Sequence, residues 1–367
     1  MSKLKLAIAF ALVAGCSIYD SSLLVEGGAP DASDAAVDAG GDVDTCDHAE
    51  PPARPGGDDP SDAGDIEFVV ALSSVDFGGD GGVVGFDLDR TCTCPGPESC
   101  VPQSGSSPHC DDTRGRDNSG GALIQQFSAL TTALDPTKLT QHIGQGLYSL
   151  LLRVRSYNGT PNDSQVSVAA FSSNGTLPLD DGGANPIPKH DGNDQWGLDP
   201  TSLVGTPPPY VAAYEDDAAY VSVGVLVANV SFPFSIGTSF GANFLRLDGA
   251  YLVGAITKTP TGYALAGVVT GRWDTRNLLT GMQGIKDPFN PGQFLCGNDA
   301  TYLAFKAAIC GAADIASEGS SDNTGAPCNA LSLALGFQAE PAELGGILAA
   351  GVRPTPCGTT YSDKCGN

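Results

Sequence analysis

Positively charged side chains are scarce in this sequence of 367 residues, which has 18 lysines and arginines against 42 aspartates and glutamates. The formal net charge is −24, and loss of Lys3 and Lys5 with a leader segment would make it −24 − 2 = −26. A strongly anionic chain is repelled by nucleic acid phosphates and by anionic lipid surfaces. We therefore expect no nucleic-acid partner.

Strong helix formers such as lysine and glutamate are also few, whereas the chain has 48 glycines and 26 prolines. Glycine and proline disfavour helices, and runs of Val, Thr, Ser and aromatic residues between turns favour sheet. The predicted fold class is mainly β: an antiparallel β-sandwich, jelly-roll-like, with two or three peripheral helices and a disulfide-stapled C-terminal section.

The sequence begins with Lys3 and Lys5, an apolar run over 6–14, and Val13-Ala14-Gly15-Cys16. The run is too short to span a bilayer as a helix, and small residues before a cysteine are typical of a processing site. The pattern resembles the bacterial lipoprotein signal. That resemblance implies that residues 1–15 are removed and that Cys16 carries acyl chains such as palmitate, which hold the protein to a membrane.

Residues 16–64 consist mainly of Asp, Ala, Gly and Pro. The stretch 17–65 holds 13 acidic residues against Arg54 alone. Such a segment buries too little apolar surface to offset the ordering of its backbone, so we predict a disordered acidic tether. A single folded domain is expected over 65–367.

Ten of the 11 cysteines remain once Cys16 is set aside for lipid. An even number in an exported chain indicates disulfides. One group is Cys92, Cys94, Cys100 and Cys110, for which zinc binding together with His109 is the alternative. The other is Cys296, Cys310, Cys328, Cys357 and Cys365, and its odd count suggests that Cys46 pairs into the C-terminal tail.

Hydrophobic patterns place strands over 66–74, 83–89, 146–157, 165–172, 210–213, 219–228, 230–236, 244–247, 250–258, 263–272 and about 331–337. Leu123, Phe127, Leu130 and Leu134 lie on one face of a predicted helix capped by Asn118 or Ser119. Further helices are predicted over 274–282 and 299–317. The stretch 174–209 is expected to be a long loop, which in a compact domain is often functional.

Two groups of oxygen ligands are candidates for calcium, a cation that is plentiful outside cells. The first is Asp76, Asp80, Asp87 and Asp89 near the first turn, and the second is Asp191, Asn193 and Asp194 in the long loop. Neither group has the EF-hand spacing, and acidic turns are often simply solvated. Asp117 and Asn118 are explained by capping of the helix that follows them.

Trp196 in the long loop is the candidate for carbohydrate contact, because an exposed indole offers an apolar face to a sugar ring. The alternative is a tryptophan that pins its own loop to the sheet. Gly237-Thr-Ser239-Phe-Gly241 matches the nucleophile-elbow pattern, but all four histidines precede it, so catalysis at Ser239 is not expected.

Three short motifs carry a further resemblance: Gly85-Phe-Asp-Leu-Asp89, Cys92-Thr-Cys94 and Gly115-Arg-Asp-Asn118. With the lipobox and the tether, they look like outer-envelope lipoproteins of predatory soil bacteria such as myxobacteria. The resemblance implies an outer-membrane location, periplasmic or surface-facing, and brings no activity with it. We expect a non-enzymatic lipoprotein that binds carbohydrate, calcium or an envelope protein. The alternative is an envelope polysaccharide hydrolase with two converging carboxylates.

Overall fold

The computed structural model describes residues 46–56, 64–78, 85–94, 96–103, 106–128, 135–178, 183–203, 217–234, 245–297, 299–348, 355–358 and 360–366. The predicted signal, Cys16, Asp80, the strand over 210–213 and Ser239 lie outside these residues. Within the described part of the chain, none of the helices is both long and apolar enough to cross a bilayer.

The described chain is mainly β, as predicted. Its strands are β1 (Ile66–Asp76), β2 (Ser149–Tyr157), β3 (Asp163–Leu177), β4 (Gln195–Leu198), β5 (Asp217–Ser222), β6 (Val225–Phe234), β7 (Leu245–Thr259), β8 (Gly262–Asp274), β9 (Ala330–Pro341) and β10 (Glu343–Ile347). Its helices are α1 (Ser119–Ser128), α2 (Pro136–Gly144), α3 (Thr275–Gly281) and α4 (Ala300–Gly311). Short 3-10 turns cover Pro200–Ser202, Met282–Gly284 and Gly319–Ser321.

Eight antiparallel strands close into a barrel in the order β3-β2-β1-β9-β8-β7-β6-β5, and β5 pairs back onto β3. The first half of β3 makes this closing pair, with Val166 opposite Ala219, while its second half pairs with β4. The parallel pair of β4 and β10 extends the sheet outside the barrel. The predicted sandwich is therefore replaced by one closed sheet, because β3 is long enough to pair with β5 as well as with β4.

Alternation along each strand separates the interior of the barrel from its outer face. On β2, Leu150, Leu152 and Val154 belong to the main core, whereas Leu151 packs in a separate cluster on the other face. On β9, Leu331, Leu333, Leu335 and Phe337 point inward in the same way. Side chains fill the interior, as in other eight-stranded barrels.

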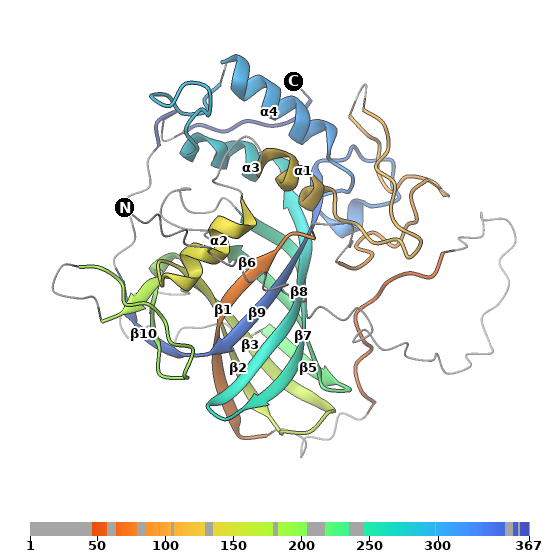
Figure 1. Cartoon of the computed structure of the whole chain (residues 1–367). Coiled ribbons are helices and arrows are strands. Elements are labelled where there is room, and N and C mark those ends of the chain that lie inside the picture. Colours follow the sequence, from red (N-terminus) through yellow and green to blue (C-terminus); the bar gives the residue numbers. More distant parts are fainter. Residues whose placement is uncertain are drawn as a thin grey trace, which may run out of the picture. The chain divides into compact units, whose positions relative to one another are not determined.

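Helices continue the main core at one end of the barrel. Figure 1 shows α1, α3 and α4 gathered at this end. Phe127 of α1 and Phe305 of α4 meet edge to face with ring centroids 4.5 Å apart, and Leu279 of α3 is fully buried beside the same core. α2 lies against β1, where Thr140 bonds to the backbone of Val75. The described residues thus form four helices instead of two or three.

Several predicted boundaries differ from the structure. The predicted strand over 219–228 is a hairpin, since Val223 and Gly224 turn the chain with φ of 51° and 81°. The predicted pair 244–247 and 250–258 is one strand, β7, with a register shift at Gly249. Residues 85–89 of the predicted strand 83–89 pair with a neighbouring segment and not with the sheet: the Asp87 N–H donates to the Ala49 carbonyl.

Candidate metal centre

Two segments outside the barrel build the site, and we call them the cap and the strap. The cap consists of the described residues of 85–118 together with 312–330. The strap is 46–56, which lies within the predicted tether 16–64. Arg272 of β8 ties the cap to the outer face of the barrel, because its buried guanidinium donates to the Asp322 carboxylate and to the Leu88 carbonyl.

The strap is packed, although the sequence predicted a disordered tether there. Its Ala49 N–H donates to the Arg114 carbonyl, its Pro52 carbonyl accepts from Tyr220 of β5, and Arg54 donates to the Ser164 carbonyl of β3. These bonds hold residues 46–56 across the cap and onto the barrel.

All ten remaining cysteines form disulfides, as predicted. The pairs are Cys46–Cys92, Cys94–Cys110, Cys100–Cys328, Cys296–Cys357 and Cys310–Cys365. Cys46 joins the strap to the cap and does not pair into the C-terminal tail. The alternative zinc cluster of the first cysteine group is contradicted as well, because Cys94, Cys100 and Cys110 are each in a disulfide.

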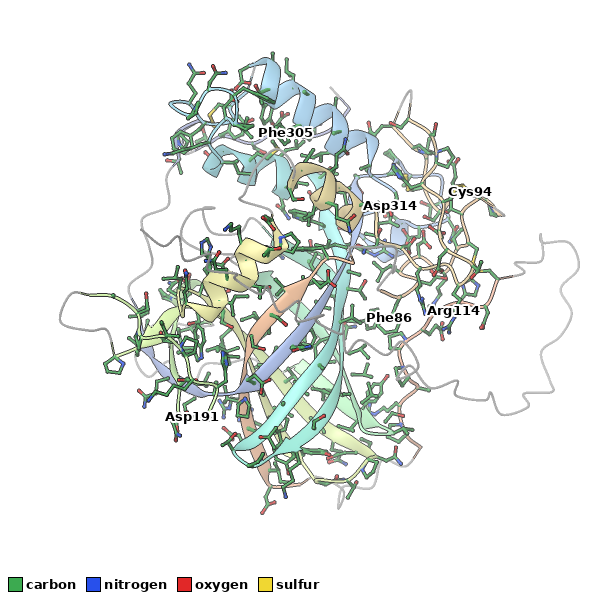
Figure 2. The ribbon with its side chains drawn as sticks, in the orientation of Figure 1. Phe86, Cys94, Arg114, Asp191, Phe305 and Asp314 are labelled. Carbon is green, nitrogen blue, oxygen red and sulfur yellow. A yellow bond between two sulfur atoms is a disulfide. The ribbon has the colours of Figure 1, made fainter. Side chains whose placement is uncertain are left out.

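Three aspartates converge beneath the strap. The carboxylates of Asp87, Asp89 and Asp117 lie within 4.8 Å of one another, and the residues are 7%, 5% and 2% exposed. Two of the three belong to the predicted calcium group. Two of the sequence motifs, 85–89 and 115–118, therefore meet at one buried point. Figure 2 labels three residues of the cap: Phe86, Arg114 and Asp314.

Backbone N–H groups orient each of the three carboxylates. Oδ1 of Asp87 accepts from Arg90 at 2.6 Å, and Oδ1 of Asp89 accepts from Thr91 at 2.9 Å. Oδ2 of Asp117 accepts from the Leu88 N–H at 3.0 Å. Each carboxylate thus has one oxygen fixed by a backbone N–H of the cap, and the second oxygen of Asp87 contacts His48 of the strap.

The carboxylates carry more negative charge than their surroundings neutralise. His48 of the strap contacts Asp87, but among the described residues no lysine or arginine pairs with Asp89 or Asp117. Burial, and then repulsion from Asp87 and Asp111, raises the pKa of Asp89 from 3.8 to about 7. Burial and the neighbouring carboxylates also hold the pKa of Asp117 well above its usual range.

Two further aspartates extend the cluster. Burial raises the pKa of Asp111 to about 6, and the Thr93 N–H bound to its carboxylate at 2.6 Å partly offsets this. Burial also raises the pKa of Asp314, against the opposing effect of the Ser332 hydroxyl and N–H. Both residues add repulsion at Asp117.

Ser99 adds a buried hydroxyl oxygen to the cluster. Its hydroxyl lies beside Asp89 and lowers the pKa of that carboxyl, and the residue is 1% exposed. Yet Ser99 Oγ makes no hydrogen bond of normal geometry with any described residue. A buried hydroxyl without a partner is costly, so a bound group at the cluster would account for it.

Gly115 leaves room at the cluster. Its φ of 66° favours glycine, and a Cβ at this position would lie 2.7 Å from Asp87 Oδ2 and 3.0 Å from Cys92 Sγ. A side chain here would occupy the space between the Asp87 carboxylate and the Cys92 sulfur.

The other candidate oxygen ligands do not join this site. Asp76 accepts from the Gly78 N–H at the end of β1. Asp191 accepts from Asn193, and Asp194 accepts from the N–H groups of Lys189 and His190. Figure 2 shows Asp191 on the side of the barrel away from Cys94 and Arg114. These carboxylates stabilise their own turns.

Trp196 is 1% exposed, so its indole offers no open face to a sugar. It lies on β4 and packs with Leu151 and Phe171 from the outer face of β2 and β3. The tryptophan pins its loop to the sheet, which was the alternative interpretation. The proposed carbohydrate contact at Trp196 has no support in this arrangement.

Sequence reasoning missed Asp117, Asp111, Asp314 and Ser99. Asn118 does cap α1, since its Oδ1 accepts from Gly121, but Asp117 turns into the cluster. The available signal was the density of aspartates between the cysteines. Their convergence depends on the Cys100–Cys328 bridge and on the Asn323 N–H, which donates to the Ser99 carbonyl.

No family model matches the chain, and neither a curated protein nor a solved structure matches it. The site therefore has to be interpreted from its own chemistry.

Proposed function

We propose that this chain is a lipid-anchored envelope protein whose barrel domain binds one calcium ion at Asp87, Asp89 and Asp117, with no catalytic role. The observation that carries the proposal is the convergence of three buried carboxylates, one of which, Asp89, lies beside the buried Ser99 hydroxyl. A divalent cation would offset the burial and the repulsion that raise the pKa values of Asp89 and Asp117, and it would bind the hydroxyl. The ion would hold the segment of Asp87 and Asp89 to Asp117 within the first part of the cap.

The ligand chemistry favours calcium over other common cations. Calcium takes six to eight oxygen ligands in flexible geometry, whereas magnesium keeps several waters. Residues that are 2–7% exposed leave little room for a hydrated magnesium ion. Zinc prefers nitrogen and sulfur ligands, which this oxygen cluster does not provide.

The proposed location of the protein is supported by two features of the chain. The lipobox pattern at Cys16 supports a lipid anchor, and the five disulfides support an oxidising compartment. Together they favour the outer membrane, with the barrel on its periplasmic or outer surface.

A polysaccharide hydrolase is disfavoured by the burial of the same carboxylates. Glycoside hydrolysis needs two carboxyl groups that flank a bound sugar. The carboxylates that converge in the described residues lie beneath the strap, where a polymer cannot reach them.

Calcium titration of the oxidised, chelator-treated chain tests the proposal. We expect one calcium ion per chain by calorimetry, and a free energy of unfolding raised by about 2.7 kcal/mol at 100 times the dissociation constant. Asp117→Asn should weaken binding at least tenfold. The matched control Asp191→Asn, at an exposed predicted ligand, should leave it unchanged. Wild-type protein that takes up no calcium would refute the proposal.

A further inference from the structure

A second group of metal-binding atoms lies where the strap crosses the cap. Ligand atoms of Cys46, His48 and Cys92 are all within 4.8 Å of one another. His48 Nδ1 is 3.9 Å from Cys46 Sγ, and it also contacts Asp87 Oδ2. Two sulfurs, an imidazole nitrogen and a carboxylate oxygen thus come from two segments that are far apart in the chain.

We propose that reduction of the Cys46–Cys92 disulfide converts this group into a zinc site, with Cys46, Cys92 and His48 as ligands and Asp87 as the fourth. Zinc is bound tetrahedrally by thiolates, imidazole and carboxylate, which is the donor set assembled here. The site is distinct from the oxygen cluster and shares only Asp87 with it. The proposal does not depend on calcium binding.

The chemistry balances with a thiol reductant. Two thiols of the reductant become its disulfide and pass two electrons to the Cys46–Cys92 bond, which becomes two thiols. Zinc then binds as both thiols lose their protons, which pass to solvent. Because zinc binds the dithiol and not the disulfide, it stabilises the reduced form, so strap and cap remain joined after the covalent bond is lost.

The surroundings permit both access and binding. Cys92 is buried, but Cys46 is partly exposed and the His48 side chain is 29% exposed, so a metal ion can enter from the strap side. Gly115 faces Cys92 Sγ and Asp87 Oδ2 without a side chain. The contact of His48 with Asp87 would bring nitrogen and oxygen to the same ion.

The neighbouring Cys94–Cys110 bridge has to be replaced for the test. Both of its residues are exposed and close to His109, so after reduction they would offer the metal a competing set of ligands. The full chain carrying Cys94→Ser and Cys110→Ser would be reduced with a phosphine, freed of it under anaerobic conditions, and titrated with cobalt(II). We expect one cobalt per chain with a sulfur-to-cobalt charge-transfer band, which zinc abolishes. The oxidised protein should give no band.

Two variants in this background make the assignment specific. Cys46→Ala should abolish the band, and His48→Ala should weaken cobalt binding at least tenfold although every other cysteine is kept. A band that survives Cys46→Ala, or an affinity unchanged by His48→Ala, would show that other thiols bind the metal and would overturn the proposal. Circular dichroism checks folding, and a calcium titration of the same samples separates failure at this site from failure at the oxygen cluster.

Discussion

Replacing Asp117 with asparagine should stabilise the calcium-free protein and weaken its stabilisation by calcium. Two unit charges 4.8 Å apart repel by about 3.5 kcal/mol at an effective dielectric constant of about 20. The asparagine side chain would keep an oxygen to accept the Leu88 N–H but would carry no charge. Partial protonation reduces the gain, so we expect the cation-free variant to be more stable than wild type by about 2–3 kcal/mol at pH 8.

The pH dependence gives this prediction a second signature. In the cation-free native state the pKa of Asp111 is about 6 and that of Asp89 about 7, both above 3.8. A raised native pKa stabilises the fold fully below the unfolded pKa, and this stability is lost as pH rises through the native pKa. Wild-type stability should therefore fall between about pH 4 and pH 8, and Asp117→Asn should lessen that fall.

Urea unfolding of both proteins at pH 5 and pH 8, with calcium or with chelator, measures these free energies. Calcium should narrow the variant's advantage at pH 8, because at 100 times the wild-type dissociation constant wild type gains about 2.7 kcal/mol, whereas a variant with tenfold weaker binding gains about 1.4 kcal/mol. A cation-free Asp117→Asn protein less stable than wild type at pH 8 would refute the reasoning. It would show that Asp117 is an ordinary hydrogen-bonding residue and not part of a repulsive cluster.

Other substitutions separate the site from the scaffold. Gly115→Ala should weaken calcium binding at least tenfold in calorimetry. The new Cβ would lie 2.7 Å from an Asp87 oxygen, and the φ of 66° disfavours alanine. An unchanged calcium affinity would contradict this. Trp196→Ala should lower the free energy of unfolding in urea by about 3–5 kcal/mol, since the indole is fully buried, and should leave calcium affinity unchanged. A small loss of stability would mean that the residues on the outer face of β2 and β3 repack. Replacing Cys100 and Cys328 with serine should lower the free energy of unfolding by about 2–5 kcal/mol. It should also weaken calcium binding, because the bridge positions Ser99. Full calcium affinity in this variant would show that the cap assembles without the bridge.

Local patterns predicted most of the strands but not their closure. The alternation of Leu150, Leu152 and Val154 identifies β2, and Thr259 to Gly262 marks the turn between β7 and β8. Inward and outward alternation is the same in a sandwich and in a barrel. What decides between them is the pairing of β3 with β5, a contact that strand alternation does not encode.

Turns and caps account for most boundary errors. Val223 adopts a φ of 51°, which a β-branched residue rarely does, and although Gly224 signals a turn, the apolar residues on both sides of it favour one continuous strand. By contrast α2 did carry a start signal. Asp135 accepts from the Thr137 N–H and Pro136 opens the helix, but this short helix was not recognised.

Half of the candidate site was visible in the sequence. Asp87 and Asp89 were candidates because two carboxylates two residues apart suit a hard cation. Asp117 was assigned to capping, and its neighbour Asn118 performs that role instead. Asp117 lies near Asp87 and Asp89 because its carboxylate accepts from the Leu88 N–H and Arg272 binds the Leu88 carbonyl. The spacing of residues in the sequence does not reveal these contacts of the folded cap.

A crystal structure of the oxidised chain grown with calcium tests the central claim most directly. The account predicts one ion with an oxygen of each of Asp87, Asp89 and Asp117 at about 2.3–2.6 Å, and with Ser99 Oγ turned toward it. Direct carboxyl-to-carboxylate hydrogen bonds at this point, with calcium absent or bound only in the Asp191 loop, would contradict it.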